Sequence, residues 1–479
     1  MSNTNRDCRP ARLTLAASAG LALVLGGAPA LAGSRDNTPI RAPESYAASE
    51  AFQAPLAAWP SDGWWSELGD PQLDQLMKEG LAGASDIREA AARFDRAEAV
   101  AGVARSRLTP TVEGQAQASS EKQTYNYLMP GEAVPHGWND AGRVGLNFAW
   151  ELDFWGKNRA ALQAAKLDAR AAGAEAAAAR LAVSTGIAAA YADLASLYAE
   201  LDTLDDAISV RGRTAEVMAK RNAQGLENAG AVERAQASKA AAESERAAVN
   251  ELIGLTKNRI AALMGAGPDR GLTISRPMIV LTDNLGLPAN VPAGLLGRRA
   301  DVMAARLRTE AAASRIKQAK AGFYPHVNLV GIVGVQSLGL GNLFNSGSDY
   351  GAVGPAISLP IFNGGRLKAE HRGAEADYAA AVAHYDGTLT QALREVADVS
   401  TSVRALDARL DRALAAEAHA EAAWKVANNR YAGGLATYLD VLSAEDALVA
   451  SRRSVAQLQS RAFTLHVALV RALGGGFHA

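Results

Sequence analysis

The sequence has 479 residues with 49 basic and 50 acidic side chains, a balance that gives no sign of nucleic-acid binding. Aromatic residues make up only 6% while alanine is abundant, a composition that favours long helices over a compact α/β enzyme. Cys8 is the only cysteine, which excludes a disulfide framework and a thiolate metal cluster.

Residues 1–32 are predicted to be a cleavable signal peptide. Three arginines precede the apolar run LTLAASAGLALVLGGAPALA, which ends in a small-x-small cleavage pattern at Ala30 to Ala32. The run is too short and too often broken by glycine to be a transmembrane anchor. Ser34 stands where a lipoprotein carries its acylated cysteine, so we expect no lipid anchor. No later segment approaches twenty apolar residues, so we expect no membrane-spanning helix.

Two strand pairs are predicted, at residues 110–152 and 325–361. Pro110 and Pro325 each follow a helical stretch, residues 85–108 and 298–322, and apolar and polar side chains alternate after them. The loops within the pairs are expected at residues 121–141 and 337–349. The strands could form half of a soluble sandwich. Four strands cannot close a sheet, however, and would leave exposed edges unless other chains supply the missing strands.

Each strand pair leads into a long helical hairpin. The segment from Asn158 to about Arg221 has no helix breaker beyond scattered glycine and would span about 95 Å. After Arg430 the chain carries a coiled-coil seam with alternating spacings of three and four residues. Gly225 and Gly434 are predicted to lie in the turns of the two hairpins. The seam positions are Val441, Ala444, Leu448, Ser451, Val455, Leu458, Ala462, Leu465, Leu469 and Ala472. The seam of the first hairpin is weaker, because Lys239 and Arg246 fall on it.

The chain contains an internal duplication. RNAQGLENAGAVERAQA, from Arg221, aligns with RYAGGLATYLDVLSAED, from Arg430, at an offset of 209 residues. Upstream the offset is 207, which pairs Leu152 with Leu359 and Arg159 with Arg366. Both copies have an aromatic, glycine-containing junction where the strands end. Aromatic rings suit a water–lipid boundary and glycines relax the change from strand to helix, although a single such cluster could also be ordinary core packing. The junction residues are Trp150, Phe154, Trp155, Gly156, Phe362, Gly364 and Gly365.

On these features the sequence resembles the TolC-like outer-membrane efflux channels, in the branch that serves resistance–nodulation–division multidrug pumps. RRADVMAARLRTEAAASRIKQAKAGFYP, LPIFNGGRLKA and RYAGGLATYLDVLSAED carry the resemblance, which extends from WWSELGDPQLDQLM to RALGGG. It implies an α+β membrane protein that forms a homotrimer. Three chains with four strands each would close a 12-stranded transmembrane β-barrel, continued by a 12-helix periplasmic α-barrel with an equatorial domain around it.

The resemblance also implies a division of the chain. Residues 33–84 would be the N-terminal equatorial segment and residues 266–296 an equatorial linker. The first repeat would be residues 85–265, with its helical hairpin at 157–265, and the second residues 297–474, with its hairpin at 365–474. Residues 475–479 would be a C-terminal tail.

The function that the resemblance implies is that of an outer-membrane exit channel in a tripartite efflux pump. The channel would sit in outer-membrane lipid and passively conduct small molecules and drugs from a periplasmic adaptor and an inner-membrane pump. It would be gated at the helix tips. The expected gate residues are Tyr431, Leu439, Asp440, Ser443 and Asp446, and the expected adaptor contacts are Arg221, Gly225, Leu226, Arg430, Gly434 and Leu435.

The gate departs from the family pattern, because Ser443 and Asp446 stand where family members place an aspartate and an arginine. Asp440 and Asp446 would each form a ring of three negative charges in a trimer, which would attract cations. The alternative for Asp440 is a solvated carboxylate on a helix face.

Other classes of protein fit less well. The seven histidines never pair at metal-ligand spacing, and no nucleophile elbow, zinc-protease motif or phosphate-binding loop is present, so we expect neither catalysis nor a cofactor. A periplasmic adaptor or another structural coiled coil would explain the hairpins but neither the strand pairs nor the duplication. An exit duct for type I protein secretion would have the same fold, and it remains open as an alternative.

Overall fold

The computed structural model describes residues 41–42, 45–47, 50–52, 55–126, 130–279, 286–288 and 291–478. The predicted signal peptide and Ser34 lie outside these residues. The elements that matter for function are, in chain order, η2 (Trp64–Leu68), α1 (Pro71–Gly83), α2 (Ser85–Ser106), β1 (Thr111–Glu121), β2 (Asn139–Glu151), α3 (Lys157–Ala223), α4 (Ala229–Leu263), α5 (Pro268–Leu272), α6 (Val291–Arg298), α7 (Ala300–Ala321), β3 (His326–Leu338), β4 (Asp349–Ser358), α8 (Arg366–Ala432) and α9 (Tyr438–Leu473).

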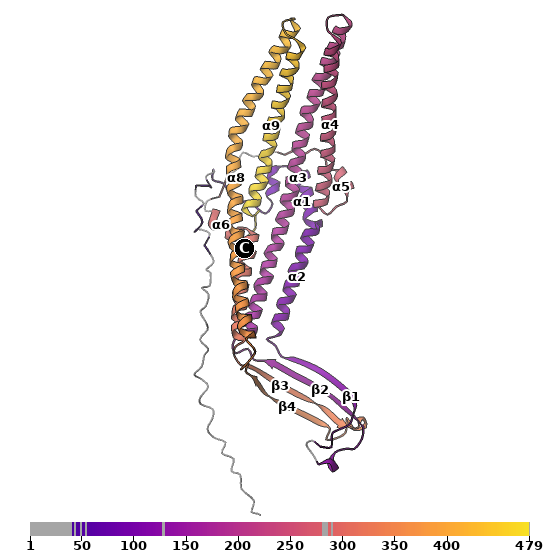
Figure 1. The fold of residues 1–479 in the computed structure, drawn as a ribbon, viewed down its shortest axis with the longest axis vertical. Helices are drawn as coiled ribbons and strands as arrows, with labels where there is room; N and C mark the ends of the chain where they lie inside the picture. The colour runs from indigo at the N-terminus through magenta and orange to yellow at the C-terminus, as the bar shows by residue number, and fades with distance from the viewer. Residues whose placement is uncertain are drawn as a thin grey trace, which may run out of the picture. The chain divides into compact units, whose positions relative to one another are not determined.

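The four strands form one antiparallel sheet in the order β1-β2-β3-β4 (Figure 1). The two strand pairs are thus joined side by side through β2 and β3, with Leu146 opposite Val333. The strand β2 begins at Asn139, two residues before the predicted end of its loop, because Asn139 and Asp140 still pair with Glu121 and Ser120. Among the described residues, the outer edges of β1 and β4 pair with no other strand.

The register gives the sheet two different faces. Val112, Phe148, Gly331 and Val353 lie opposite one another across all four strands, and neighbouring rows on this apolar face are also apolar. Residues one step along each strand point to the other side. There the polar face carries Gln117, Arg143 and Gln336 in one row. The apolar face is open within one chain, because side chains such as Val112 and Val353 are 63% and 81% exposed. Val330, Ile332 and Leu338 are large apolar side chains on the polar face.

The two long helices, α3 and α8, have 67 residues each and span about 100 Å. Each begins directly after a glycine with positive φ, Gly156 at +76° and Gly365 at +86°. These helices therefore align at an offset of 209 residues along their whole length. The pairing of Arg159 with Arg366 at an offset of 207 is wrong, because the connector from β4 to α8 is two residues longer than that from β2 to α3.

The long hairpins pack through α9 and α3. Figure 1 draws α8, α9, α3 and α4 side by side in that order. Most of the expected seam of α9 is buried, including Val441, Leu448 and Val455. On the first hairpin, the side chains of Lys239 and Arg246 are partly exposed to solvent and form ion pairs with Glu243 and Asp205. The charges on the first seam therefore do not prevent the helices from packing.

In the N-terminal segment, residues 64–84 pack across the middle of the long helices. Trp64 and Met77 are buried against α3, α4 and α9. The Asp70 carboxylate caps α1 and accepts hydrogen bonds from the Tyr191 hydroxyl at 2.7 Å and the Met278 N–H at 2.8 Å. Burial raises the pKa of Tyr191. Asp70 thus joins the N-terminal segment, α3 and the stretch after α5.

Arg299 forms a corresponding link in the second half. Its guanidinium, 7% exposed, contacts Asp301, Glu395 at 2.7 Å and the carbonyl oxygen of Ala472 at 3.1 Å. The chain beyond α9 then turns back to the N-terminal segment. A Cβ added at Gly476 would lie 2.4 Å from the backbone nitrogen of Asp62, so only glycine fits there.

By length and composition, one described helix could cross a membrane, which differs from our expectation of none. A stretch of 18 residues in α3 has a mean hydropathy of 1.2. Small residues such as alanine, rather than a run of large apolar side chains, give the stretch its hydropathy, so it does not stand out in the sequence. Half of this stretch is buried inside the protein, as in the core helix of a folded domain.

Candidate gate at the helix tips

The two helical hairpins end in turns with the same backbone geometry. Gly225 and Gly434 have φ angles of +71° and +72°, in the left-handed region that favours glycine. The residue after each glycine donates its N–H to the carbonyl five positions earlier, which is the Schellman motif. These hydrogen bonds run from Leu226 to Arg221 at 2.9 Å and from Leu435 to Arg430 at 2.8 Å.

An aromatic cluster joins the two tips. The Tyr431 hydroxyl lies 3.3 Å from a carboxylate oxygen of Glu227 and 3.4 Å from the sulfur of Met218. The Arg221 guanidinium lies 5.1 Å from the centre of the Tyr431 ring, and the Tyr438 ring packs against Tyr431 edge to face. Burial raises the pKa of Tyr431 and raises that of Tyr438 to about 12, so both hydroxyls are protonated at neutral pH.

Asp440 has a local structural role at the start of α9. Its carboxylate accepts hydrogen bonds from the N–H and the hydroxyl of Thr437, both at 2.8 Å, and completes a capping box. These hydrogen bonds hold the pKa of Asp440 below its usual value. Asp440, which we expected in the gate, therefore caps the N-terminus of α9, and its side chain remains exposed.

A single arginine ties the two hairpins together below the tips. Arg211 of α3 contacts Asp446 at 2.6 Å and Glu445 at 3.4 Å, both on α9, and donates to the carbonyl oxygen of Ser238 on α4 at 3.2 Å. The side chain of Arg211 is 14% exposed and that of Glu445 is 3% exposed, whereas Asp446 is 56% exposed. Three helices thus meet at one mostly enclosed cation.

Burial dominates the electrostatics of Glu445. It raises the pKa of this carboxyl, although the neighbouring Arg211 acts in the opposite direction. Without Arg211 the charged form of Glu445 would be enclosed without a cation. The ion pair with Arg211 is therefore what permits an ionised carboxylate at this point between the hairpins.

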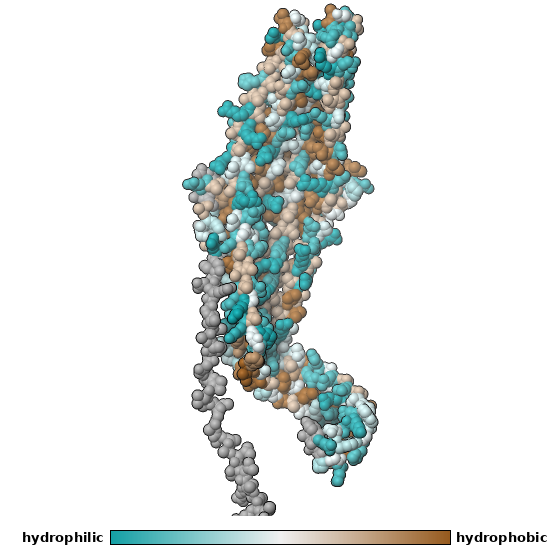
Figure 2. All heavy atoms as spheres, in the orientation of Figure 1, coloured by the Kyte–Doolittle hydropathy of each residue, from teal (hydrophilic) through white to brown (hydrophobic). Residues whose placement is uncertain are grey.

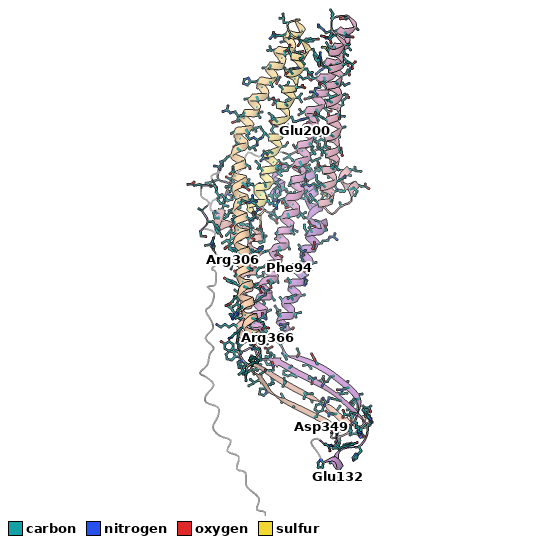
Figure 3. The ribbon with its side chains drawn as sticks, in the orientation of Figure 1. Phe94, Glu132, Glu200, Arg306, Asp349 and Arg366 are labelled. Carbon is teal, nitrogen blue, oxygen red and sulfur yellow. The ribbon has the colours of Figure 1, made fainter. Side chains whose placement is uncertain are left out.

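A second arginine repeats the arrangement nearer the middle of the helices. Arg453 of α9 contacts Glu200 of α3 at 3.2 Å and Glu245 of α4 at 2.6 Å. Figure 3 labels Glu200 on α3, where that helix runs beside α9. Both arginines hold α9 against the first hairpin.

Within one chain the expected gate residues take part in different contacts. Tyr431 belongs to the aromatic cluster, together with the expected adaptor contact Arg221, and Asp446 belongs to the Arg211 tie. Ser443 is exposed on α9. The expected leucines are also exposed: Leu226 by 62%, Leu435 by 73% and Leu439 by 59%.

Arg211 and Glu445 were not among the residues predicted from the sequence. The one available signal was that Glu445 follows the seam position Ala444 directly, where a charge needs a partner on a neighbouring helix. Nothing in the sequence indicated which arginine would supply it.

The junction residues lie where the helices meet the sheet. The indole N–H of Trp155 donates to the carbonyl of Pro325 at 2.9 Å, and its ring stacks on Tyr324. The indole of Trp150 donates to the carbonyl of Leu108 at 3.1 Å. Phe154 and Phe362 are 64% and 92% exposed. Figure 2 shows apolar side chains gathered at this end of the helices. The glycines of the second junction, Gly364 and Gly365, both have positive φ.

The described residues contain no cluster of three or more His, Cys, Asp or Glu side chains placed to hold a metal ion. The described side chains at the tips form ion pairs, hydrogen bonds and aromatic contacts, and those of Arg211 and Tyr431 join the two hairpins.

Comparison with known protein families identifies the fold. The family model described as outer membrane efflux protein matches residues 76–266 and 291–475, one range in each repeat. The chain belongs to the outer membrane efflux protein family. The resemblance to TolC-like channels is thereby confirmed, and with it the location in the outer membrane and the absence of an enzymatic role. Members of the family act as trimers and are the outer-membrane components of tripartite efflux pumps.

Individual relatives of this efflux protein support the assignment. The outer membrane protein VceC of Vibrio cholerae is 48% identical, with a TM-score of 0.84 over 88% of this chain and 100% of that chain. The multidrug resistance outer membrane protein MdtP of Escherichia coli K12 is 30% identical over 91% of both chains. The fusaric acid resistance protein FusA of Burkholderia cepacia is 36% identical over 66% of this chain, and the match spans 60% of FusA.

Proposed function

We propose that three copies of this chain close a twelve-stranded barrel in the outer membrane and form a passive, gated exit channel. The observation that carries the proposal is the sheet. It has one apolar face in register across all four strands and a polar face behind it. Its strands have 10 to 13 residues, which is long enough to cross a bilayer at a tilt.

The unpaired edges of the sheet require other copies. A sheet whose outer strands expose backbone N–H and C=O groups is not viable in lipid, where no water satisfies them. Pairing β4 of one chain with β1 of the next removes both edges, and three copies bring the ring to twelve strands. The apolar face would then contact lipid, and Arg143 and its polar neighbours would line a water-filled interior.

The helices would continue the barrel into the periplasm. Four long helices per chain, α3, α4, α8 and α9, give a wall of twelve in the trimer. The exposed aromatics at the junction, Phe154 and Phe362, would mark the inner edge of the lipid. The N-terminal segment and the stretch after α4 would form the equatorial domain.

The gate would lie at the helix tips, and the structure would represent its closed state. Opening would move the α8–α9 hairpin away from the α3–α4 hairpin, and this motion breaks the contacts of Arg211 with Glu445 and Asp446. The aromatic cluster around Tyr431 would separate in the same step. We place the lock at Arg211 because it forms ion pairs with two carboxylates of the other hairpin close to the tips.

The partners would be a periplasmic adaptor and an inner-membrane pump. The tips offer exposed Leu226 and Leu435 as adaptor contacts. MdtP is named for multidrug resistance, and we infer by similarity that this channel also passes small drug-like molecules. The signal peptide would be removed after Ala32 and Ser34 would stay unacylated, which the mass of the mature protein tests.

The deciding experiment combines assembly with conduction. Cysteine pairs placed across β4 and β1 would link different copies, because the mature chain has no cysteine of its own. We expect an outer-membrane trimer that is covalently closed after oxidation, and small gated conductances in planar bilayers. A monomer with its sheet sealed within one chain would overturn the proposal.

A further inference from the structure

A polar groove opens on the helical bundle where α3, α8 and α9 meet. Arg409 of α8 and Arg461 of α9 line it. The groove also presents Ser196 of α3 and the hydroxyl side chains Ser454, Ser460 and Thr464 of α9. Arginines from two different helices therefore line one hollow together with hydroxyl-bearing residues.

The charge of the groove is not neutralised from within. Its one acidic residue, Asp193, is already bound by Arg259 at 3.2 Å. Across the part of the chain that the structure describes, neither Arg409 nor Arg461 forms an ion pair with an acidic side chain. Arg211, Arg299 and Arg453 differ in this respect, because each contacts two carboxylates.

The groove lies on the side of α9 that faces away from the N-terminal segment. His466 marks the opposite side, because its ring lies 6.2 Å from that of Trp64. Arg461 precedes His466 by five residues, which places the two side chains about 140° apart around the helix. A segment as bulky as η2 and α1 would fill the channel if it lay inside. In the trimer of the proposed function, on which this step rests, the groove therefore lines the tunnel.

We propose that this groove is a binding site for small oxyanions, and in particular for the carboxylate group of anionic molecules passing through the tunnel. A planar guanidinium matches a carboxylate through two parallel hydrogen bonds, and hydroxyl groups can donate to the remaining lone pairs. Three copies would place three such sites around the tunnel. Binding is weak, because a site in a conduit must also release its occupant.

The test measures binding of two probes, sodium benzoate and inorganic phosphate, to the purified full-length trimer by calorimetry. We compare Arg409→Gln/Arg461→Gln with a control that removes one arginine from each of the same helices outside the groove, Arg404→Gln/Arg471→Gln. Arg404 lies five residues from Arg409, on another side of α8. We expect the groove variant to bind benzoate about tenfold more weakly and the control to bind as the wild type does.

The two probes identify the chemistry. Loss of benzoate binding alone supports a carboxylate site, and parallel loss of phosphate binding supports a general oxyanion site. Unchanged affinities in the groove variant, or an equal loss in the control, overturn the proposal. Should the double variant fail to assemble, Arg409→Lys and Arg461→Lys keep the charge but lose the paired hydrogen bonds, and each should weaken benzoate binding.

Failure of this inference is distinguishable from failure of the channel. If wild-type trimers conduct in bilayers but benzoate binding is insensitive to the groove, only the groove assignment falls. If wild-type protein gives neither trimer nor conductance, the proposed function itself falls.

Discussion

Replacing Arg211 by glutamine should open the channel. In the proposed closed state the substitution leaves Glu445, which is 3% exposed, without its cation. Leaving a buried charge without its partner costs about 3–5 kcal/mol. Loss of the ion pair between Arg211 and the exposed Asp446 adds less than about 1 kcal/mol. Because the pKa of Glu445 is already raised, proton uptake offsets part of the cost. We therefore expect the lower figure, about 3 kcal/mol.

The cost applies to the closed tips and not to open tips, in which Glu445 is solvated. A difference of about 3 kcal/mol changes the ratio of closed to open channels by about 150-fold. Planar-bilayer recording at neutral pH should therefore show Arg211→Gln with long-lived large conductances where the wild type shows rare openings.

The matched control is Arg259→Gln. It removes an ion pair with Asp193 that lies within one hairpin, so the gate should behave as in the wild type. The reasoning is refuted if Arg211→Gln conducts like the wild type while its trimer melts at a lower temperature. That result would mean that the tie stabilises the fold in both gate states.

Three further predictions concern pH, the turns and the sheet. Burial in the closed tips raises the pKa of Glu445 above its ordinary 4.5. The closed tips therefore bind this proton more tightly than the open tips do, so the open probability of the channel should fall as the pH is lowered from neutral toward 4.5. Glu445→Gln should abolish that dependence, and a wild type insensitive to pH would contradict it. Gly434→Ala forces a Cβ into a left-handed turn and should destabilise the tip by about 1 kcal/mol. The measurement is hydrogen exchange at the Leu435 amide, which should become faster, and an unchanged exchange rate would argue against backbone strain. Gly334→Ala would place a Cβ 2.3 Å from the carbonyl oxygen of Val144 and should prevent trimer assembly, whereas Gly354→Ala, which meets nothing within 4 Å, should assemble normally in the same outer-membrane fractions.

Much of the fold could be read from the sequence because its signals are local and repeated. Alternation of apolar and polar residues indicated the strands, and the absence of proline indicated the long helices. Gly225 and Gly434 indicated the turns, since few other residues accept their φ angles. The duplication strengthened each of these signals by supplying it twice.

The interior of the candidate site could not be read in the same way. The tie made by Arg211 joins residues more than two hundred positions apart, and its partners depend on how α3 and α9 pack. The local contact of Asp440 was within reach of the sequence. Its partner Thr437 is only three residues away, so the capping pattern can be recognised there, and the expected role of Asp440 in the gate stays a prediction.

The equal length of α3 and α8 constrains how the two repeats can differ. Both helices run for 67 residues from their starting glycines, so the two hairpins of each chain reach equally far from the sheet. In the proposed trimer, an insertion confined to one hairpin would make the end of the tunnel uneven. The proposed tunnel could therefore lengthen or shorten evenly only through matching insertions or deletions in both repeats.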